Sequence, residues 1–172
     1  MTDAAHSGWR AGKPAGPLSG LGLFVVAATV IVDQATKILA DTSLAYGEPL
    51  PLLPILTLFR VNNPGIAFSM FADSSAWLMT LVPIVVSAVV VGFWVRTHEG
   101  GRLAAAGFAL ILGGAIGNLI DRLRLGHVID FLLLHIGDRS LFVFNIADVA
   151  LTIGPALLLI VYLWPGGNRP AA

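Results

Sequence analysis

Four long apolar segments constrain the fold of this chain more than any other feature. A bilayer core about 30 Å thick is crossed by a helix of about 20 apolar residues. With 12% charged residues and a mean hydropathy of +0.85, the chain lacks the polar surface of a soluble protein. We therefore predict an all-α membrane protein with four transmembrane helices. These are expected at Leu18 to Ala40, Ala76 to Val95, Leu103 to Leu123 and Ile146 to Trp164.

The regions outside these segments predict domain organisation and orientation. Residues 1–17, rich in Ala, Gly, Ser and Pro, are expected to form a disordered tail, residues 18–164 the helical domain, and residues 165–172 a second tail. Four spans place both tails on one side. Five basic residues on that side against four on the other indicate cytoplasmic tails. The five are Arg10, Lys13, Arg96, Arg102 and Arg169, and the four are Arg60, Arg122, Arg124 and Arg139.

The first span has an alternative interpretation as a cleavable signal peptide. Arg10 and Lys13, followed by the apolar run from Leu21 to Val32, have the layout of such a peptide. Asp33 and Lys37 favour a retained helix instead, because residues four apart lie on one helix face and their opposite charges pair there. Pairing lowers the cost of placing both charges in the membrane.

The region from Asp41 to Ser75 is too long for a simple hairpin. Its apolar run from Pro51 to Val61 predicts short strands lying on the membrane. Pro and Gly in Asn62-Asn63-Pro64-Gly65 predict a turn, followed by a second apolar stretch from Ile66 to Phe71. We expect a small β-rich region outside the cytoplasm.

The third span combines small and polar residues. Gly113 and Gly117 have the spacing that lets another helix backbone approach closely. Asn118, Asp121 and Arg122 follow at i, i+3 and i+4, so their side chains are expected to project toward one region. These residues predict a tightly packed helix that ends in a polar cluster.

Asp130 and Asp148 each lie at the edge of an apolar segment, where a carboxylate is costly and therefore a candidate for function. They are 148 − 130 = 18 residues apart, which leaves room for an excursion through the turn Gly137-Asp138-Arg139 and a return to similar depth. Two carboxylates in contact at low dielectric share one proton. Such a pair activates water and protonates a leaving amine, as in aspartic proteases. Asn145 shares a helix face with Asp148.

Five motifs occur in a fixed order along the chain. They are Asp33-Gln34-Ala-Thr-Lys37, Asn63-Pro-Gly65-Ile-Ala67-Phe68, Gly113-Gly-Ala-Ile-Gly117-Asn118-Leu-Ile-Asp121-Arg122, Val128-Ile-Asp130-Phe131 and Phe144-Asn145-Ile-Ala147-Asp148. Together they closely resemble the signature blocks of lipoprotein signal peptidase, also called signal peptidase II. The resemblance extends from about Leu21 to Trp164. It implies an aspartic endopeptidase of the bacterial inner membrane that removes signal peptides from diacylglyceryl-modified prolipoproteins, on the N-terminal side of the lipidated cysteine.

The resemblance also implies a role for each matching residue. Asp130 and Asp148 would be catalytic. Asn63, Gly65 and Phe68 would belong to the external region that helps to hold the substrate. Asp33 and Lys37 would be structural. The residues that orient the dyad or the substrate would be Asn118, Asp121, Arg122 and Asn145.

The resemblance implies no metal or other cofactor. The four histidines, His6, His98, His127 and His135, have no clustered spacing that suggests a metal site. The expected partners are the prolipoprotein substrates and membrane lipid, and the expected state is a monomer. A formal net charge of +0 gives no reason to expect nucleic-acid binding.

Several alternatives remain open on residue chemistry alone. Asp121 has a spacing that would allow it to replace Asp130 as the partner of Asp148, although Arg122 and Asn118 are its nearer partners. Buried acids beside Lys37 and Arg122 are also typical of a proton-coupled transporter. Interhelical polar contacts alone would suit a membrane scaffold. The Gly-x-Gly-Asp motif of presenilin-type peptidases does not match, because His135 stands at its first glycine.

Overall fold

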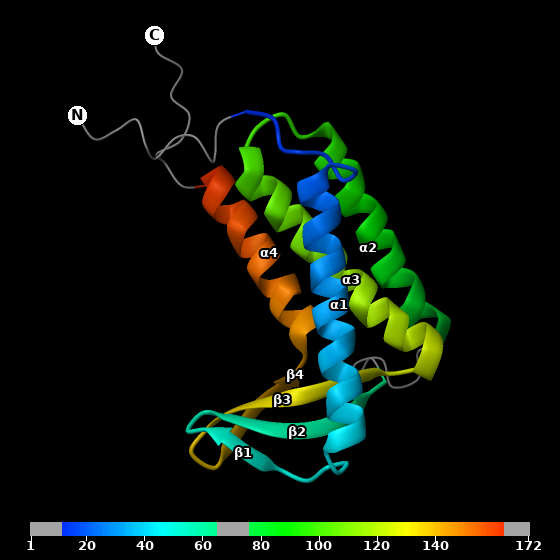
Figure 1. The fold of residues 1–172 in the computed structure, drawn as a ribbon, viewed down its shortest axis with the longest axis vertical. Coiled ribbons are helices and arrows are strands. Elements are labelled where there is room, and N and C mark those ends of the chain that lie inside the picture. Colours follow the sequence, from blue (N-terminus) through cyan, green and yellow to red (C-terminus); the bar gives the residue numbers. More distant parts are fainter. Residues whose placement is uncertain (1–11, 65–75, 164–172) are drawn as a thin grey trace, which may run out of the picture.

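The helices form a bundle, and a small sheet lies at one end of it, where the first helix reaches the sheet (Figure 1). The computed structural model describes residues 12–64 and 76–163. The start of α1 and the end of α4 lie at the end of the bundle away from the sheet. The described helices begin and end within three residues of the predicted segments. They are α1 (Gly20–Ser43), α2 (Ala76–Arg96), α3 (Gly101–Leu125) and α4 (Ile146–Leu163).

Three of these helices are long and apolar enough to cross a membrane. They are α1, α3 and α4, and many of the apolar side chains on the outside of the bundle are exposed, as they would be to lipid. The part of α2 whose side chains are described, Leu81–Arg96, is a shorter apolar helix. The prediction of apolar membrane helices is therefore confirmed for three of them, and a fourth span remains a prediction.

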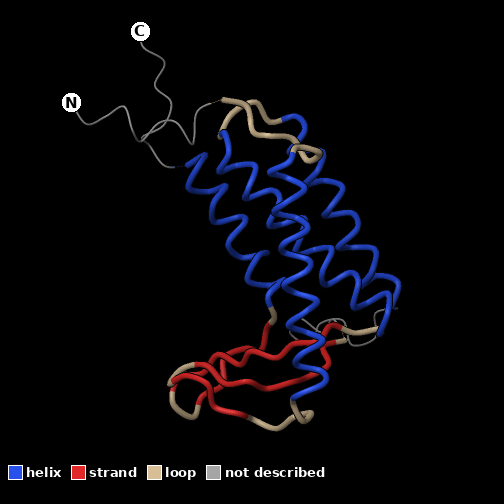
Figure 2. The backbone as a smooth tube through the Cα atoms, in the orientation of Figure 1, coloured by secondary structure: helices blue, strands red, loops and turns tan. Residues whose placement is uncertain are grey.

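The sheet, red in Figure 2, has four antiparallel strands in the order β1, β2, β3, β4. The strands predicted between α1 and α2 form one half of it. The other half comes from the segment between α3 and α4, where only an excursion with a turn was expected. The strands are β1 (Leu50–Leu53), β2 (Leu56–Asn63), β3 (Val128–Ile136) and β4 (Arg139–Phe144).

The predicted turn at Asn62-Asn63-Pro64-Gly65 is wrong for its first two residues. Asn62 lies opposite Ile129 and Asn63 lies opposite Val128 in the β2–β3 ladder. Pairing with a strand about 65 residues later in the chain outweighs the local turn preference of asparagine. Gly65, and the second apolar stretch predicted from residue 66 to residue 71, lie outside the described residues.

Glycines in α3 allow α1 and α4 to approach its backbone. A Cβ atom on Gly113 would lie 2.7 Å from the Cβ of Thr29, and one on Gly117 would lie 2.5 Å from an oxygen of Asp33. A Cβ on Gly114 would lie 2.5 Å from the carbonyl oxygen of Ala147 at the start of α4. The packing role predicted for Gly113 and Gly117 is confirmed. It places the polar residues of α1, α3 and α4 within reach of one another.

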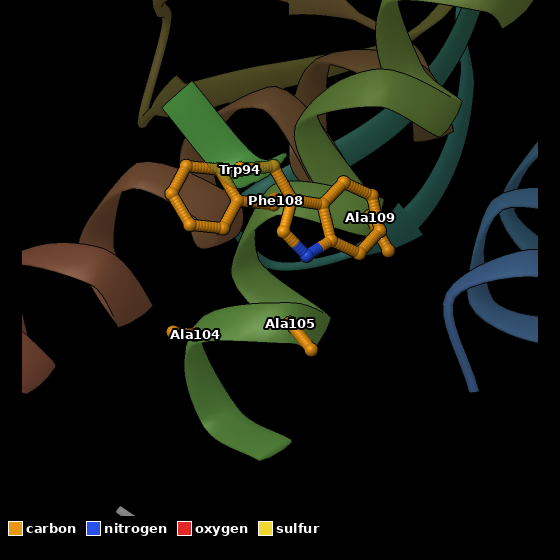
Figure 3. Close-up of a cluster of buried hydrophobic side chains, with 5 residues drawn as sticks. All are labelled: Trp94, Ala104, Ala105, Phe108 and Ala109. Carbon is orange, nitrogen blue, oxygen red and sulfur yellow. The ribbon is translucent and has the colours of Figure 1, made fainter. Parts of the chain in front are cut away.

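Trp94 organises the apolar core of the bundle (Figure 3). Its ring stacks on Phe108 with centroids 5.8 Å apart, and it packs against alanines of α3. The indole Nε1 donates a hydrogen bond to the Ala15 carbonyl oxygen at 2.8 Å. Residues 12–17, within the predicted tail, thus contact the bundle, and residues 1–11 lie outside the described part. The tail and domain boundaries remain predictions.

Candidate active site

Asp130 and Asp148 lie where the sheet meets the helices. Asp130 is in β3, outside the helical bundle, and Asp148 is in the first turn of α4. The apolar segment at whose edge Asp130 was expected is therefore a strand. In the hairpin of β3 and β4 (Figure 1), Phe144 lies opposite Leu132, so the chain returns close to Asp130 before α4 begins. This topology explains how an interval of 18 residues brings two acids to one place.

The start of α4 is fixed by reciprocal hydrogen bonds. The Asp148 backbone N–H donates to the Asn145 side-chain oxygen at 3.0 Å, and the Asn145 backbone N–H donates to Asp148 Oδ2 at 3.2 Å. This is the arrangement of a capping box, in which side chains satisfy free backbone groups of the first turn. A third group comes from α1, because Asp33 Oδ1 accepts the Ala147 N–H at 2.8 Å. Asp148 is thus held by the helix start and remains partly exposed.

Asp130 is almost completely buried, with 2% of its surface exposed. Its two carboxyl oxygens accept amide hydrogens from Asn63 at 2.9 Å and from Asn145 at 2.6 Å. The pKa of Asp130 is raised to about 6, mainly by burial and also by the charge of Asp148, and the hydrogen bonds from Asn63 and Asn145 and the charge of Lys37 oppose this rise. The surroundings of Asp130 therefore favour its protonated form.

Two asparagine side chains connect the acids. The Asn145 amide donates to Asp130, and its oxygen accepts from the Asp148 backbone. The Asn118 amide nitrogen donates to Asp148 Oδ1 at 2.9 Å, and its oxygen accepts from Asn145 Nδ2 at 3.3 Å. Both asparagines are buried. Their amides form a continuous chain of hydrogen bonds between the carboxyl groups, which fixes the orientation of both acids.

A buried ion cluster lies behind Asn118. The Lys37 ammonium is 2.9 Å from a carboxylate oxygen of Asp33 and 2.9 Å from one of Asp121. The pairing predicted between Asp33 and Lys37 is confirmed, and Asp121 is a second acidic partner that the sequence spacing did not reveal. Lys37 Nζ also donates to the Asn118 side-chain oxygen at 2.8 Å. Three ionised groups in the interior are thus paired with one another, as burial of charge requires.

Gln34 belongs to one of the five motifs and contacts the ion cluster, although no role was predicted for it. Its amide nitrogen lies within hydrogen-bond distance of Asp121 Oδ1 at 2.9 Å, of the Gly117 carbonyl oxygen at 3.1 Å and of Asp33 at 3.2 Å. The residue follows Asp33 directly and faces α3 as well. Only its position inside the motif Asp33-Gln34-Ala-Thr-Lys37 could have marked it as a candidate site residue.

Arg122 is half-buried at the end of α3, with Nη1 donating to the Asn118 carbonyl oxygen at 3.4 Å. Its Nε is buried and has no hydrogen-bond partner among the described residues. The positive charge interacts most strongly with Asp148, then with Asp130 and Asp121. Arg122 is therefore placed to balance the negative charge of the acidic pair.

The structure brings most of the predicted site residues together. Asn63, Asn118, Asp121, Arg122 and Asn145 all lie in or beside the hydrogen-bonded network of the two acids. Gly65 and Phe68 lie outside the described residues. Asp121 is occupied by Lys37, Gln34 and the Ile129 N–H. These contacts favour Asp130 over Asp121 as the partner of Asp148.

An apolar groove borders Asp148. It has a volume of about 430 Å³. Its walls come from β4 and α4, through Phe142, Val143, Phe144, Asp148, Val149, Thr152 and Ile153. Within residues 12–64 and 76–163, no three His, Cys, Asp or Glu side chains are grouped as metal ligands. The site thus combines two acids, a polar network and an apolar approach on the α4 side.

Known families and structures match this chain over most of its length. A family model described as signal peptidase (SPase) II matches residues 25–164. The chain belongs to the signal peptidase II family. Lipoprotein signal peptidases of Brucella ovis and Brucella melitensis are each 44% identical to it over 138 residues, 80% of this chain and 86% of theirs. Members of the signal peptidase II family are peptidases, and the apolar helices suit a membrane protein.

Two solved structures share the fold. One, a bacterial membrane enzyme determined by the in meso method at 2.3 Å resolution, has a TM-score of 0.78 at 26% identity. The match between the two covers 95% of this chain and 99% of the chain in that structure. Another, determined by the same method at 1.9 Å resolution, has a TM-score of 0.77 at 28% identity. This match covers 91% of this chain and 98% of the chain in that structure. The helices and small antiparallel sheet of this signal peptidase II family member are therefore a membrane enzyme fold.

Proposed function

We propose that the protein is an intramembrane aspartic endopeptidase that removes signal peptides from diacylglyceryl-modified bacterial prolipoproteins. Cleavage falls on the N-terminal side of the lipidated cysteine. The observation that carries this proposal is the hydrogen-bonded chain from Asp130 through Asn145 to Asp148, beside an apolar groove. Membership of a peptidase family and the names of the Brucella relatives support the substrate class.

In the proposed reaction the two aspartates share one proton. The ionised carboxylate takes a proton from a water molecule as its oxygen attacks the scissile carbonyl carbon, while the protonated carboxyl donates to the carbonyl oxygen. The resulting tetrahedral intermediate collapses as the carboxyl group that took the water proton gives it to the peptide nitrogen and the C–N bond breaks, while a hydroxyl of the intermediate returns its proton to the other carboxylate. The products are a signal peptide with a free carboxyl group and a cysteine with a free amino group. The dyad ends with one proton, as it began.

The remaining site residues hold this arrangement. Asn63, Asn118 and Asn145 orient the carboxyl groups through their amides. Arg122, with a free N–H at Nε among the described residues, balances charge and is placed to donate to the substrate. Gly65 and Phe68 are assigned by the motif to the external region over the substrate. The groove on the α4 side accepts an apolar part of a substrate that arrives within the bilayer.

The proposed setting is the bacterial inner membrane, with both termini cytoplasmic and the sheet outside. The arrangement of the helix ends at one end of the bundle and the sheet at the other supports this topology (Figure 1). We propose a monomer that uses no cofactor and has lipid and prolipoproteins, rather than nucleic acid, as partners. The buried ion cluster that would suit a transporter or scaffold serves instead as support for the site.

Cleavage of a purified prolipoprotein tests this function. The protein is incubated in detergent with the same precursor in two forms, with and without the diacylglyceryl group on its cysteine, and the products are identified by mass spectrometry. We expect the lipidated form to yield a product that begins with the modified cysteine, at a much higher rate than the unlipidated form. Equal rates, or cleavage at another bond, would contradict the proposed substrate and position.

A further inference from the structure

Lys37 lies one hydrogen bond from the residue that holds Asp148. Its side chain is 2% exposed, and its ammonium donates to the Asn118 side-chain oxygen at 2.8 Å. The amide nitrogen of the same asparagine donates to Asp148 Oδ1 at 2.9 Å. An unbroken path therefore runs from a buried cation in α1, through α3, to a carboxylate in the first turn of α4.

The ammonium sets the orientation of the Asn118 amide. An ammonium group has three donors and no acceptor, whereas an asparagine amide has a donor end and an acceptor end. If the amide were turned over, its NH₂ group would meet the ammonium of Lys37, and its oxygen would face the Asp148 carboxylate. Both contacts would be repulsive. As long as Lys37 is charged, Asn118 must present its N–H groups to Asp148.

Asp33 and Asp121 hold Lys37 at this position. Each carboxylate oxygen is 2.9 Å from the ammonium, so the lysine has fixed partners on two sides and directs its remaining donor to Asn118. A purely structural ion pair between α1 and α3 would be complete without that third contact. The third contact connects the ion cluster to the catalytic acids.

Asp148 is surrounded by hydrogen-bond donors at the start of α4. It lies in the first turn of α4, where the helix dipole stabilises a negative charge, and it accepts N–H groups from Asn118 and from the Asn145 backbone. Asp130 also accepts two amides, but it is buried in the sheet, which favours its neutral form. The charged groups that face this pair from the packed elements are Asp33 and Lys37 of α1 and Asp121 and Arg122 of α3.

We propose that Lys37 is a positioning residue for catalysis, acting through Asn118 to hold Asp148 as the ionised, water-activating member of the dyad. Asp130 is then the member that carries the proton. The proposal rests on the proposed peptidase function and gives each acid a role within it. Lys37 itself touches neither substrate nor the reacting atoms.

A double-mutant cycle tests the path. The variants are Lys37→Met, Asn118→Ala and the two combined, with Lys13→Met as a control at an exposed lysine. Cleavage of lipidated precursor is measured across pH and normalised to folded protein. Each single variant is expected to lower kcat on the order of 10²-fold, as misplacement of a reacting group does, with KM nearly unchanged. The combined variant is expected to be no worse than the poorer single variant, because both remove one path.

The pH profile separates positioning from a merely structural role. With the Lys37 path broken, protonation of the dyad becomes easier, so the acidic side of the kcat/KM profile is expected to move to higher pH in Lys37→Met and in Asn118→Ala. Lys13→Met is expected to keep the wild-type profile. A Lys37→Met protein with wild-type kcat and profile, or losses that multiply in the combined variant, would overturn the proposal.

A charge-matched background covers the case in which Lys37→Met does not fold. Asp121→Asn with Lys37→Met keeps the net charge of the cluster and removes one of the two carboxylates that would be left unpaired. In this case Lys37→Met, Asn118→Ala and their combination are all made in the Asp121→Asn background, and each is compared with Asp121→Asn alone. The results that would support or overturn the proposal are the same as in the first cycle. Failure of the proposed function would look different, since wild-type protein would then cleave no precursor at all.

Discussion

Asp130 is the acid of the candidate site whose pKa is raised by its surroundings. It is buried in β3, faces two amide donors, and lies close enough to Asp148 to respond to its charge. The pKa of its carboxyl group is raised from 3.8 to about 6, with burial as the largest cause. The raised pKa links the acid to the stability of the folded protein as well as to its chemistry.

The sign of this link predicts how stability changes with pH. Between pH 3.8 and about 6 the folded protein binds a proton at Asp130 that the unfolded chain has released. The contribution of Asp130 to stability is therefore fully present below pH 3.8 and is lost as the pH rises through about 6, by roughly 3 kcal/mol. In detergent micelles, we expect the melting temperature of the wild-type protein to fall more between pH 4 and 7 than that of Asp130→Asn.

The control for this prediction is Asp138→Asn, a substitution at an exposed turn between β3 and β4. This variant is expected to keep the wild-type dependence of melting temperature on pH. If Asp130→Asn and wild type show the same dependence, the Asp130 carboxyl group is not held in its neutral form by the fold.

Sequence spacing could predict contacts within one helix but not between helices at this scale. Asp33 and Lys37 are four residues apart, so their ion pair follows from helix geometry alone. The contacts of Lys37 with Asp121 and Asn118 join residues more than 80 positions apart and depend on how α1 packs against α3. The two catalytic candidates could be identified because a charged carboxylate beside an apolar segment is unusual. Gln34 is polar but uncharged, so its position did not mark it as a candidate in the same way.

At the scale of elements, the close contact of α1 with α3 positions the ion cluster. A methyl group on Gly117 would lie 2.5 Å from the Asp33 carboxylate, which is fixed by Lys37 and by the start of α4. Because Asp33 cannot move without breaking these bonds, we expect Gly117→Ala to cost about 1 to 3 kcal/mol of stability and to lower activity. Thermal melts and cleavage rates measure the two effects.

Gly92→Ala in α2 is the matched control. Its added Cβ would lie 3.5 Å from Nη1 of Arg96, an ordinary contact with the end of a flexible side chain. Wild-type stability and activity are expected. Gly117→Ala with the same melting temperature as Gly92→Ala would show that α1 and α3 are not packed as described.

The helices could be predicted from sequence far better than the sheet. A run of about 20 apolar residues usually forms a helix in a bilayer, because a helix satisfies its own backbone hydrogen bonds. Strands β3 and β4 have no such local requirement, and Asn62 and Asn63 carry a turn preference that pairing with β3 overrides. Strand pairing between segments far apart in the sequence was therefore the part of the fold that could not be predicted.

In the whole molecule, the acidic pair and the apolar core lie at different ends. The polar network lies where α4 and β3 meet, whereas Trp94 packs on Phe108 near the end of α2 away from the sheet (Figures 1 and 3). We expect Trp94→Ala to cost about 3 to 5 kcal/mol of stability, because it removes a large buried ring. The kcat of the remaining folded protein is expected to stay close to that of wild type.

Phe93→Ala serves as the comparison, since the neighbouring ring is 65% exposed on the outside of α2. Its melting temperature in detergent is expected to stay near the wild-type value. A large loss of kcat in folded Trp94→Ala would show that the two ends of the molecule are coupled.

Asparagine variants of Asp130 and Asp148 test whether both carboxyl groups are needed for cleavage. Cleavage of lipidated prolipoprotein is followed with purified wild type, Asp130→Asn and Asp148→Asn, in the presence of a metal chelator, with folding checked by thermal melt. We predict that wild type cleaves with chelator present and that both folded variants are inactive. Activity retained in either folded variant, or a wild type that the chelator stops, would contradict the mechanism.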